Sequence, residues 1–180
     1  MKLSLAMLIV VALATASGAQ QSSTKPNQSS SHPAASDSAF AMKAAQANMA
    51  EVELGKLALQ KAMSDDVKKF AQMMVDDHSK ANGELTSLAG QKSVSLPTEP
   101  LPPAKAAKDH LSTLSGAAFD KAYMDHMVKD HEKAVALFSK EASGGKDPDT
   151  TSWAEKTLPT LQQHLAKARE VAGKVGTSSR

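Results

Sequence analysis

The protein has 180 residues and no cysteine, which excludes disulfide bonds, cysteine-based zinc sites and a cysteine nucleophile. Its 21 Lys and Arg nearly balance its 19 Asp and Glu, and this balance argues against dedicated binding of nucleic acid. Aromatic residues make up only 3% of the chain, which argues against a β-sandwich or β-barrel. The remaining composition, rich in Ala, Leu, Met and Lys, favours helices in one domain.

Residues 1–19 have the pattern of a secretory signal peptide. Lys2 precedes a short apolar stretch, and small residues follow where a signal peptidase would cleave. The stretch is too short to cross a bilayer, which needs about 20 residues. We therefore expect a mature protein that is periplasmic or secreted, with no stable membrane insertion after cleavage. Retention of the uncleaved N-terminus in a membrane is the alternative.

Residues 20–36 are rich in Ser, Gln and Pro and almost free of apolar side chains. Such a segment cannot bury enough surface to offset the entropy lost on ordering, so we expect a disordered linker. A helical bundle over residues 37–174 and a flexible tail over residues 175–180 complete the predicted organisation.

Apolar residues at helical spacing predict a first helix from about Asp37 to Met63. Ser64 resembles an N-cap, and a second helix follows it. Because the break between them is so short, the two helices should form an antiparallel hairpin. The residues of the first helix expected to face inward are Phe40, Ala47, Ala50, Leu54, Leu57 and Ala58.

Residues 90–103 contain four prolines and cannot form one regular helix, but a short helix is expected over residues 104–114. A third long helix is predicted over residues 117–142. Pro148 begins the fourth, which extends to about Gly173, and Pro159 should kink it or break it in two.

The order of these elements is hairpin, long connection, hairpin. A connection of about 25 residues can run the length of the bundle and make the second and third long helices parallel. This predicts an all-α, ferritin-like four-helix bundle with a long crossover. An up-down-up-down bundle with a loose middle loop is the alternative.

Three histidines, His78, His131 and His164, lie on the predicted inward faces of the second, third and fourth long helices. Glu51 lies near the edge of the inward face of the first helix. Counted along the helices, all four fall within about two turns of the middle of the bundle. Because bundle metal sites are built from side chains that converge in this way, these four residues are candidate metal ligands.

The same residues allow a metal-free interpretation. Asp77 and Asp130 each precede a histidine, and neighbours on a helix point in different directions, so each would pair with a residue of another helix. With Glu51 and Tyr123 they could form a buried polar network that needs no metal. Asp77, Tyr123 and Asp130 would otherwise support the metal ligands, and the sequence leaves both interpretations open.

A carboxylate-bridged di-iron centre is not predicted, because it requires Glu-x-x-His motifs. The positions three residues before the histidines are Val75, Val128 and Leu161. A single zinc, copper or iron ion in a histidine-rich site is the form that remains. Phosphate-binding loops and nucleophile motifs are absent from the sequence, so no catalytic residue is assigned and an enzyme is not expected.

Several short motifs together resemble the exported bacterial family called domain of unknown function 4142. They are Glu51-Val52-Glu53-Leu54-Gly55, Asp77-His78, Phe119 to Tyr123, Asp130-His131, and Leu158 to Leu161 followed by His164. The resemblance covers about Asp37 to Gly173 and implies a ferritin-like bundle, with no established activity. It also implies that Glu53 belongs to the polar motifs around the candidate ligands, although helical spacing does not explain its place.

These observations leave two expectations for function. The first is an exported helical bundle of uncharacterised activity that binds one metal ion through core histidines and a carboxylate. The second is a non-enzymatic structural or stress-related protein of the cell envelope, with a metal-free polar core. The sequence identifies no protein partner.

Overall fold

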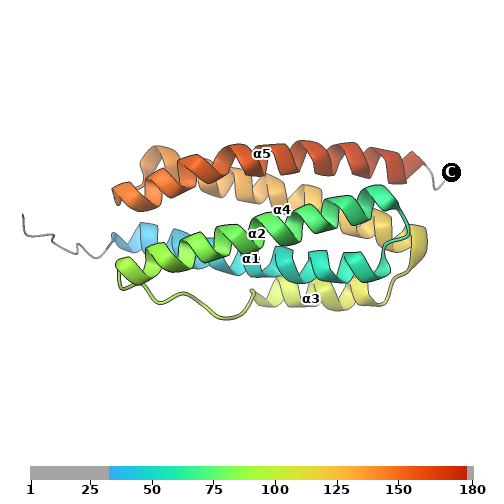
Figure 1. Cartoon of the computed structure of the whole chain (residues 1–180), viewed down its shortest axis with the longest axis horizontal. Coiled ribbons are helices and arrows are strands. Elements are labelled where there is room, and N and C mark those ends of the chain that lie inside the picture. Colours follow the sequence, from blue (N-terminus) through green and yellow to red (C-terminus); the bar gives the residue numbers. More distant parts are fainter. Residues whose placement is uncertain (1–32, 178–180) are drawn as a thin grey trace, which may run out of the picture.

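The computed structural model describes residues 33–177, which contain five α-helices (Figure 1). They are α1 (Ala35–Lys61), α2 (Asp65–Gln91), α3 (Pro102–Ser112), α4 (Gly116–Gly144) and α5 (Pro148–Thr177). The predicted signal peptide and nearly all of the predicted linker lie outside the described residues. None of the helices within residues 33–177 combines the length and apolar character needed to cross a membrane.

The four long helices form a bundle of two antiparallel hairpins, α1–α2 and α4–α5 (Figure 1). In Figure 1, α2 and α4 both run from right to left, so these two helices are parallel. The connection between them returns along the bundle and carries α3, which packs against α1 and α4. This is the ferritin-like arrangement with a long crossover, as the sequence predicted, and the up-down-up-down alternative is wrong.

Several helix boundaries differ from those predicted. α1 begins at Ala35, inside the segment expected to be linker. α3 begins at Pro102 because proline is well tolerated in the first turn, where the missing N–H would have no helical partner. α5 is unbroken through Pro159, whose exposed ring faces solvent, and the predicted break is wrong. It continues to Thr177 because Val175 packs in the core, so the tail expected from residue 175 begins as helix.

An aspartate from each hairpin holds the turn of the other. Asp120, near the start of α4, accepts hydrogen bonds from the backbone N–H groups of Met63 at 3.1 Å and Ser64 at 2.8 Å. Asp37, near the start of α1, accepts two bonds from the α4–α5 turn, at 3.0 and 2.6 Å. The side chain of Ser64 makes no capping hydrogen bond. The carboxylate of Asp120 therefore satisfies two backbone donors in the turn between α1 and α2.

α1 and α2 approach each other closely at Gly55. A Cβ atom at this position would lie 2.8 Å from Cγ2 of Val75 and 3.0 Å from the carbonyl oxygen of Ala71. Both distances are shorter than ordinary van der Waals contacts, so the helices could not pack this closely around a larger residue. The close packing holds α1 in a defined register beside α2.

Two apolar clusters fill the core, and the three histidines lie between them. On α2, Met74 belongs to one cluster and Leu85 to the other, with His78 between them. His131 and His164 separate the two clusters in the same way on α4 and α5. The bundle therefore contains a buried polar layer between two apolar halves.

Candidate metal centre

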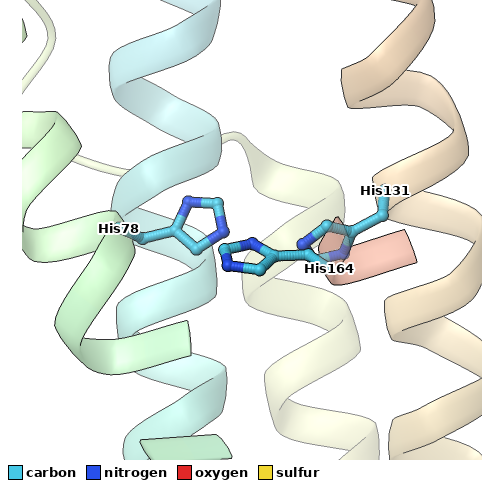
Figure 2. Close-up of side chains that lie close together, drawn as sticks. All are labelled: His78, His131 and His164. Carbon is cyan, nitrogen blue, oxygen red and sulfur yellow. The ribbon is translucent and has the colours of Figure 1, made fainter. Parts of the chain in front are cut away.

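The three core histidines converge from three helices, as Figure 2 shows. His78 comes from α2, His131 from α4 and His164 from α5. These residues are only 5%, 1% and 2% exposed, respectively. The ring centroids lie 5.7 Å apart for His78 and His131, 5.5 Å for His78 and His164, and 5.4 Å for His131 and His164. The rings thus form a nearly equilateral triangle, which we call the histidine triad.

The geometry of the triad is close to that of a metal site. One nitrogen from each ring lies within 4.8 Å of one nitrogen from each of the others. Zn–N bonds of about 2.0–2.1 Å require ligand nitrogens about 3.3–3.5 Å apart. Small side-chain adjustments would therefore bring the three nitrogens around one ion.

Each ring of the triad has an oxygen acceptor beside one of its nitrogens. An acceptor fixes the proton on the nitrogen that it contacts and leaves the lone pair on the other nitrogen. The three pairs are His78 Nδ1 with Asn48 Oδ1 at 2.9 Å, His131 Nδ1 with the Met127 carbonyl oxygen at 2.9 Å, and His164 Nε2 with Asp77 Oδ2 at 2.8 Å.

The other nitrogen of each ring has no hydrogen-bond partner within the described residues. These atoms are His78 Nε2, His131 Nε2 and His164 Nδ1, and all three are buried. A buried polar atom without a partner is destabilising by roughly 1–3 kcal/mol. Three such atoms in one layer require an explanation, and a metal ion bound to three lone pairs would supply it.

The triad is held in the neutral form that metal ligation requires. Burial lowers the pKa of His78 well below its usual value, and repulsion from His131 and His164 adds to this effect. Burial also lowers the pKa of His131 to about 4. For His164, burial lowers the pKa although Asp77 opposes the change. All three rings are therefore available as neutral donors near pH 7.

Glu51, the fourth predicted ligand, is not brought into the triad. It is not one of the residues whose donor atoms lie within 4.8 Å of one another. Its Oε1 atom lies 3.9 Å from Nδ1 of His131, the nitrogen beside the Met127 carbonyl. Burial raises the pKa of Glu51 to about 8, and the charge of Asp130 adds to the rise. Glu51 is thus a buried neighbour of the centre that is protonated at neutral pH.

Two of the predicted supporting residues contact the centre or its surroundings. Asp77 bonds directly to His164 across the α2–α5 interface, the cross-helix pairing that the sequence allowed. Tyr123 is fully buried, its hydroxyl group has no partner in the described part of the chain, and burial together with the charge of Glu51 raises its pKa. Tyr123 packs against Phe70, which in turn contacts the ring of His131.

The other two predicted supporting residues have partners nearer the surface. Glu53 forms an ion pair with Lys108 of α3 at 2.9 Å, and both side chains are largely exposed. Asp130 lies 3.0 Å from His126 and 2.9 Å from Lys133 on its own helix. Burial raises the pKa of Asp130, but these two neighbours outweigh it and hold the value at about 2.

Asn48 is the site residue that the sequence did not predict. Ala47 was expected to face inward on α1, but it is exposed, whereas Asn48 is 4% exposed and contacts His78. Asn48 lies one helical turn before Glu51, on the same face. An amide side chain one turn before Glu51, between Ala47 and Ala50, was the sequence signal that could have identified it.

The fold and the site together define a class of protein, an all-α bundle with a buried histidine triad. The chain belongs to the family described as Domain of unknown function (DUF4142), whose family model matches residues 21–171. Comparison with curated proteins found no match.

Solved structures share the fold at low sequence identity. A DUF305 fragment from Deinococcus radiodurans is 17% identical, with 79% of this chain and 98% of that chain covered and a TM-score of 0.70. A DUF305 protein from Streptomyces coelicolor is 13% identical, with 78% and 92% covered and a TM-score of 0.68. CopM in its Cu(II)-bound form is 17% identical, with 77% and 96% covered and a TM-score of 0.66. At these identities the likeness shows the fold.

Proposed function

We propose that this protein binds a single transition-metal ion through His78, His131 and His164. The observation that carries the proposal is that three buried rings converge, one nitrogen of each within 4.8 Å of one nitrogen of each other ring, and that every ring keeps a buried nitrogen without a hydrogen-bond partner among the described residues. Each opposite nitrogen has the kind of oxygen acceptor that orients histidine ligands in metal sites. A metal-free core would leave these three buried lone pairs unsatisfied.

Among the candidate ions zinc, copper and iron, we propose copper. Imidazole nitrogen is a good ligand for copper and zinc, and the triad adds no charge of its own. A neutral, deeply buried donor set is suited to a monovalent ion such as Cu⁺, whose charge is less costly to bury than that of a divalent ion. CopM, a protein of the same fold, is known in Cu(I)-bound and Cu(II)-bound forms.

The proposed role is to hold or carry the ion rather than to catalyse a reaction. The triad offers three nitrogen donors and no bridging carboxylate, so it lacks the donors of a di-iron oxidase. Val75, Val128 and Leu161 occupy the positions that such a centre fills with acids or bridging groups.

We place this role in the periplasm or outside the cell. The proposal rests on the signal-peptide pattern of residues 1–19, which lie outside the described part of the chain. Mass spectrometry of the protein recovered from a periplasmic fraction would test it, because cleavage within residues 14–20 predicts a mature chain shorter by the signal. A full-length chain found in the membrane fraction would contradict it.

Elemental analysis of untagged protein tests the metal proposal. We expect about one copper or zinc ion per chain after reconstitution and dialysis, with a rise in melting temperature. His78→Ala, His131→Ala and His164→Ala should each lose the ion, whereas His110→Ala, at an exposed position on α3, should retain it. Circular dichroism would establish that each variant is folded.

The alternative function, a structural or stress-related envelope protein with a metal-free polar core, predicts a different result. His78→Ala would then lower the free energy of unfolding by roughly 1–3 kcal/mol through the lost bond to Asn48, with no change in metal content. The metal proposal would be wrong, and this alternative favoured, if the metal content of the wild-type protein were no higher than background and Zn²⁺, Cu²⁺ and Fe²⁺ caused no thermal shift.

A further inference from the structure

A cavity of about 430 Å³ lies beside the histidine triad, between α1, α4 and the start of α3. Its volume is within the range of small-molecule binding sites, about 300–1,000 Å³. His78 and His131 line it, whereas His164 does not. The cavity therefore meets the triad on the side of α1, the one long helix that contributes no histidine.

Small side chains and the crossover create this space. Ala47 and Ala50 on α1 face Ala134 on α4 across the cavity, so the two helices leave a gap that side chains do not fill. The start of α3 and the residue before it cover the cavity, with Leu101 and Ala104 among the lining residues. Leu101 is an exposed large apolar side chain at this position. The walls of the cavity are mainly apolar, although the charged residues Lys43, Asp130 and Lys133 also line it.

Two residues that line the cavity each have a buried polar atom with no hydrogen-bond partner in the described part of the chain. Oε2 of Glu51 and Nδ2 of Asn48 belong to residues that line the cavity and are 6% and 4% exposed. The opposite atom of the Asn48 amide is already used by His78. Buried polar atoms of this kind ordinarily have partners, and a change of side-chain rotamer would present these two to a molecule in the cavity.

We infer that the cavity binds a small molecule with an apolar body and one nitrogen or oxygen donor atom, and that this atom completes the coordination of the metal ion. The inference rests on the proposed metal centre. Three protein ligands leave a fourth position open on a tetrahedral ion, as in sites that bind an exogenous ligand. The body of the molecule lies against the alanines and Leu101, and Glu51 and Asn48 contact its polar part.

Titration of the copper-loaded protein with 4-phenylimidazole and with imidazole tests this inference. Both probes offer the same nitrogen donor, but only 4-phenylimidazole has an apolar body of a size that the cavity can hold. We expect the electron paramagnetic resonance spectrum of bound Cu²⁺ to change with both, and 4-phenylimidazole to bind at least about tenfold more tightly, a difference of about 1.4 kcal/mol.

Two variants of α3 separate the cavity from general effects. Ala104 lines the cavity, so Ala104→Trp should fill it and abolish the preference for 4-phenylimidazole, with the copper content unchanged. Ala106 is exposed on the same helix and does not line the cavity, so Ala106→Trp should behave as the wild type.

The possible results are distinguishable. If copper binds but neither probe alters the spectrum, or if both bind equally in wild type and Ala104→Trp, the inference is wrong and the metal proposal stands. Removal of copper by the probes, seen by elemental analysis after titration, also overturns the inference. If copper does not bind at all, the proposed function and the inference fail together.

Discussion

Asp77 Oδ2 lies 2.8 Å from Nε2 of His164, across the interface between α2 and α5. The side chain of His164 is 3% exposed, whereas that of Asp77 is 43% exposed and remains hydrated. The carboxylate therefore fixes the proton on Nε2 and directs the Nδ1 lone pair to the interior without itself becoming a buried charge. The negative charge of a carboxylate that is hydrogen-bonded to the ring also makes the imidazole a stronger donor to a metal ion.

Replacing this carboxylate should weaken metal binding. We expect Asp77→Asn to lower the affinity for copper or zinc by roughly 10–100-fold, because the amide keeps the shape but removes the charge. Competition with a chromophoric chelator would measure the change. Asp76→Asn is the matched control, since Asp76 is the exposed neighbour that accepts a bond from Gln72. Equal affinities for the two variants would show that Asp77 has no such role.

The metal-free protein should lose stability in mild acid. The pKa of His131 falls from 6.5 to about 4 on burial, so between these values the unfolded chain binds a proton that the folded chain excludes. The contribution of His131 to stability therefore declines as the pH falls from 6.5 towards 4, by an amount on the order of 3 kcal/mol. His78 and His164 act in the same direction.

Urea unfolding at pH 7, 5.5 and 4.5 would measure this decline. His131→Gln should reduce the dependence on pH, and His110→Ala, at an exposed position, should leave it unchanged. In the metal-loaded protein, stability should fall more steeply at the pH where protons displace the metal ion, because ligation requires neutral rings. Because Glu51 acts in the opposite direction over this range, the decisive comparison is between wild type and His131→Gln, and the same pH dependence in both would contradict the expectation.

Glu51 should affect stability in the opposite pH direction. Burial, assisted by Asp130, raises its pKa from 4.5 to about 8, so the folded chain retains a proton that the unfolded chain releases. The contribution of Glu51 to stability is therefore greatest below pH 4.5 and is lost as the pH rises through 8. Glu51→Gln removes this titration. It should therefore stabilise the protein at pH 8.5 by a few kcal/mol more than at pH 5, a difference that follows from the size of the pKa change.

Chemical unfolding of wild type and Glu51→Gln at the two pH values would test this expectation. The same variant separates two roles for the residue. Because Glu51 lies outside the triad, Glu51→Gln should bind metal with unchanged stoichiometry. Loss of the ion in this variant would restore Glu51 as a ligand, and a stability difference independent of pH would show that its proton is not retained.

Asp120 should stabilise the fold without affecting metal binding. Asp120→Ala leaves the backbone N–H groups of Met63 and Ser64 without their acceptor, and we expect a loss of roughly 2–3 kcal/mol in the free energy of unfolding. Asp125→Ala removes only an exposed ion pair with Lys121 and should cost less than about 1 kcal/mol. Urea titration compares them, and equal effects would contradict the assigned role of Asp120.

The helices of this protein follow largely from local sequence. Apolar spacing and the prolines of residues 90–103 predicted the long helices and the crossover, because both signals act within a few residues. The boundaries were less accurate where tertiary packing decides them. Val175 extends α5 beyond Gly173 because the core of the bundle reaches that far, and helical spacing alone could not show this.

The candidate site was predicted in part. His78, His131 and His164 were found because helical spacing gives the face of each residue and its depth to within about one turn, near 5.4 Å. That precision was insufficient on α1, where Glu51 was chosen and Asn48, one turn earlier, contacts the triad. Ligand positions depend on distances of a few tenths of an ångström, which require the rotation and register of packed helices.

The sequence by itself determined that this protein is a cysteine-free helical bundle with a histidine layer, because composition and periodicity act locally along the chain. Only the tertiary structure decided which nitrogen of each ring has an acceptor, which lone pairs converge, and where the cavity reaches the triad. Asn48, Met127 and Asp77 lie on three different helices, α1, α4 and α2. Asn48 and Asp77 contact histidines 30 and 87 residues away through helix packing, whereas the contact of Met127 with His131 depends on the rotamer of that ring within one helical turn.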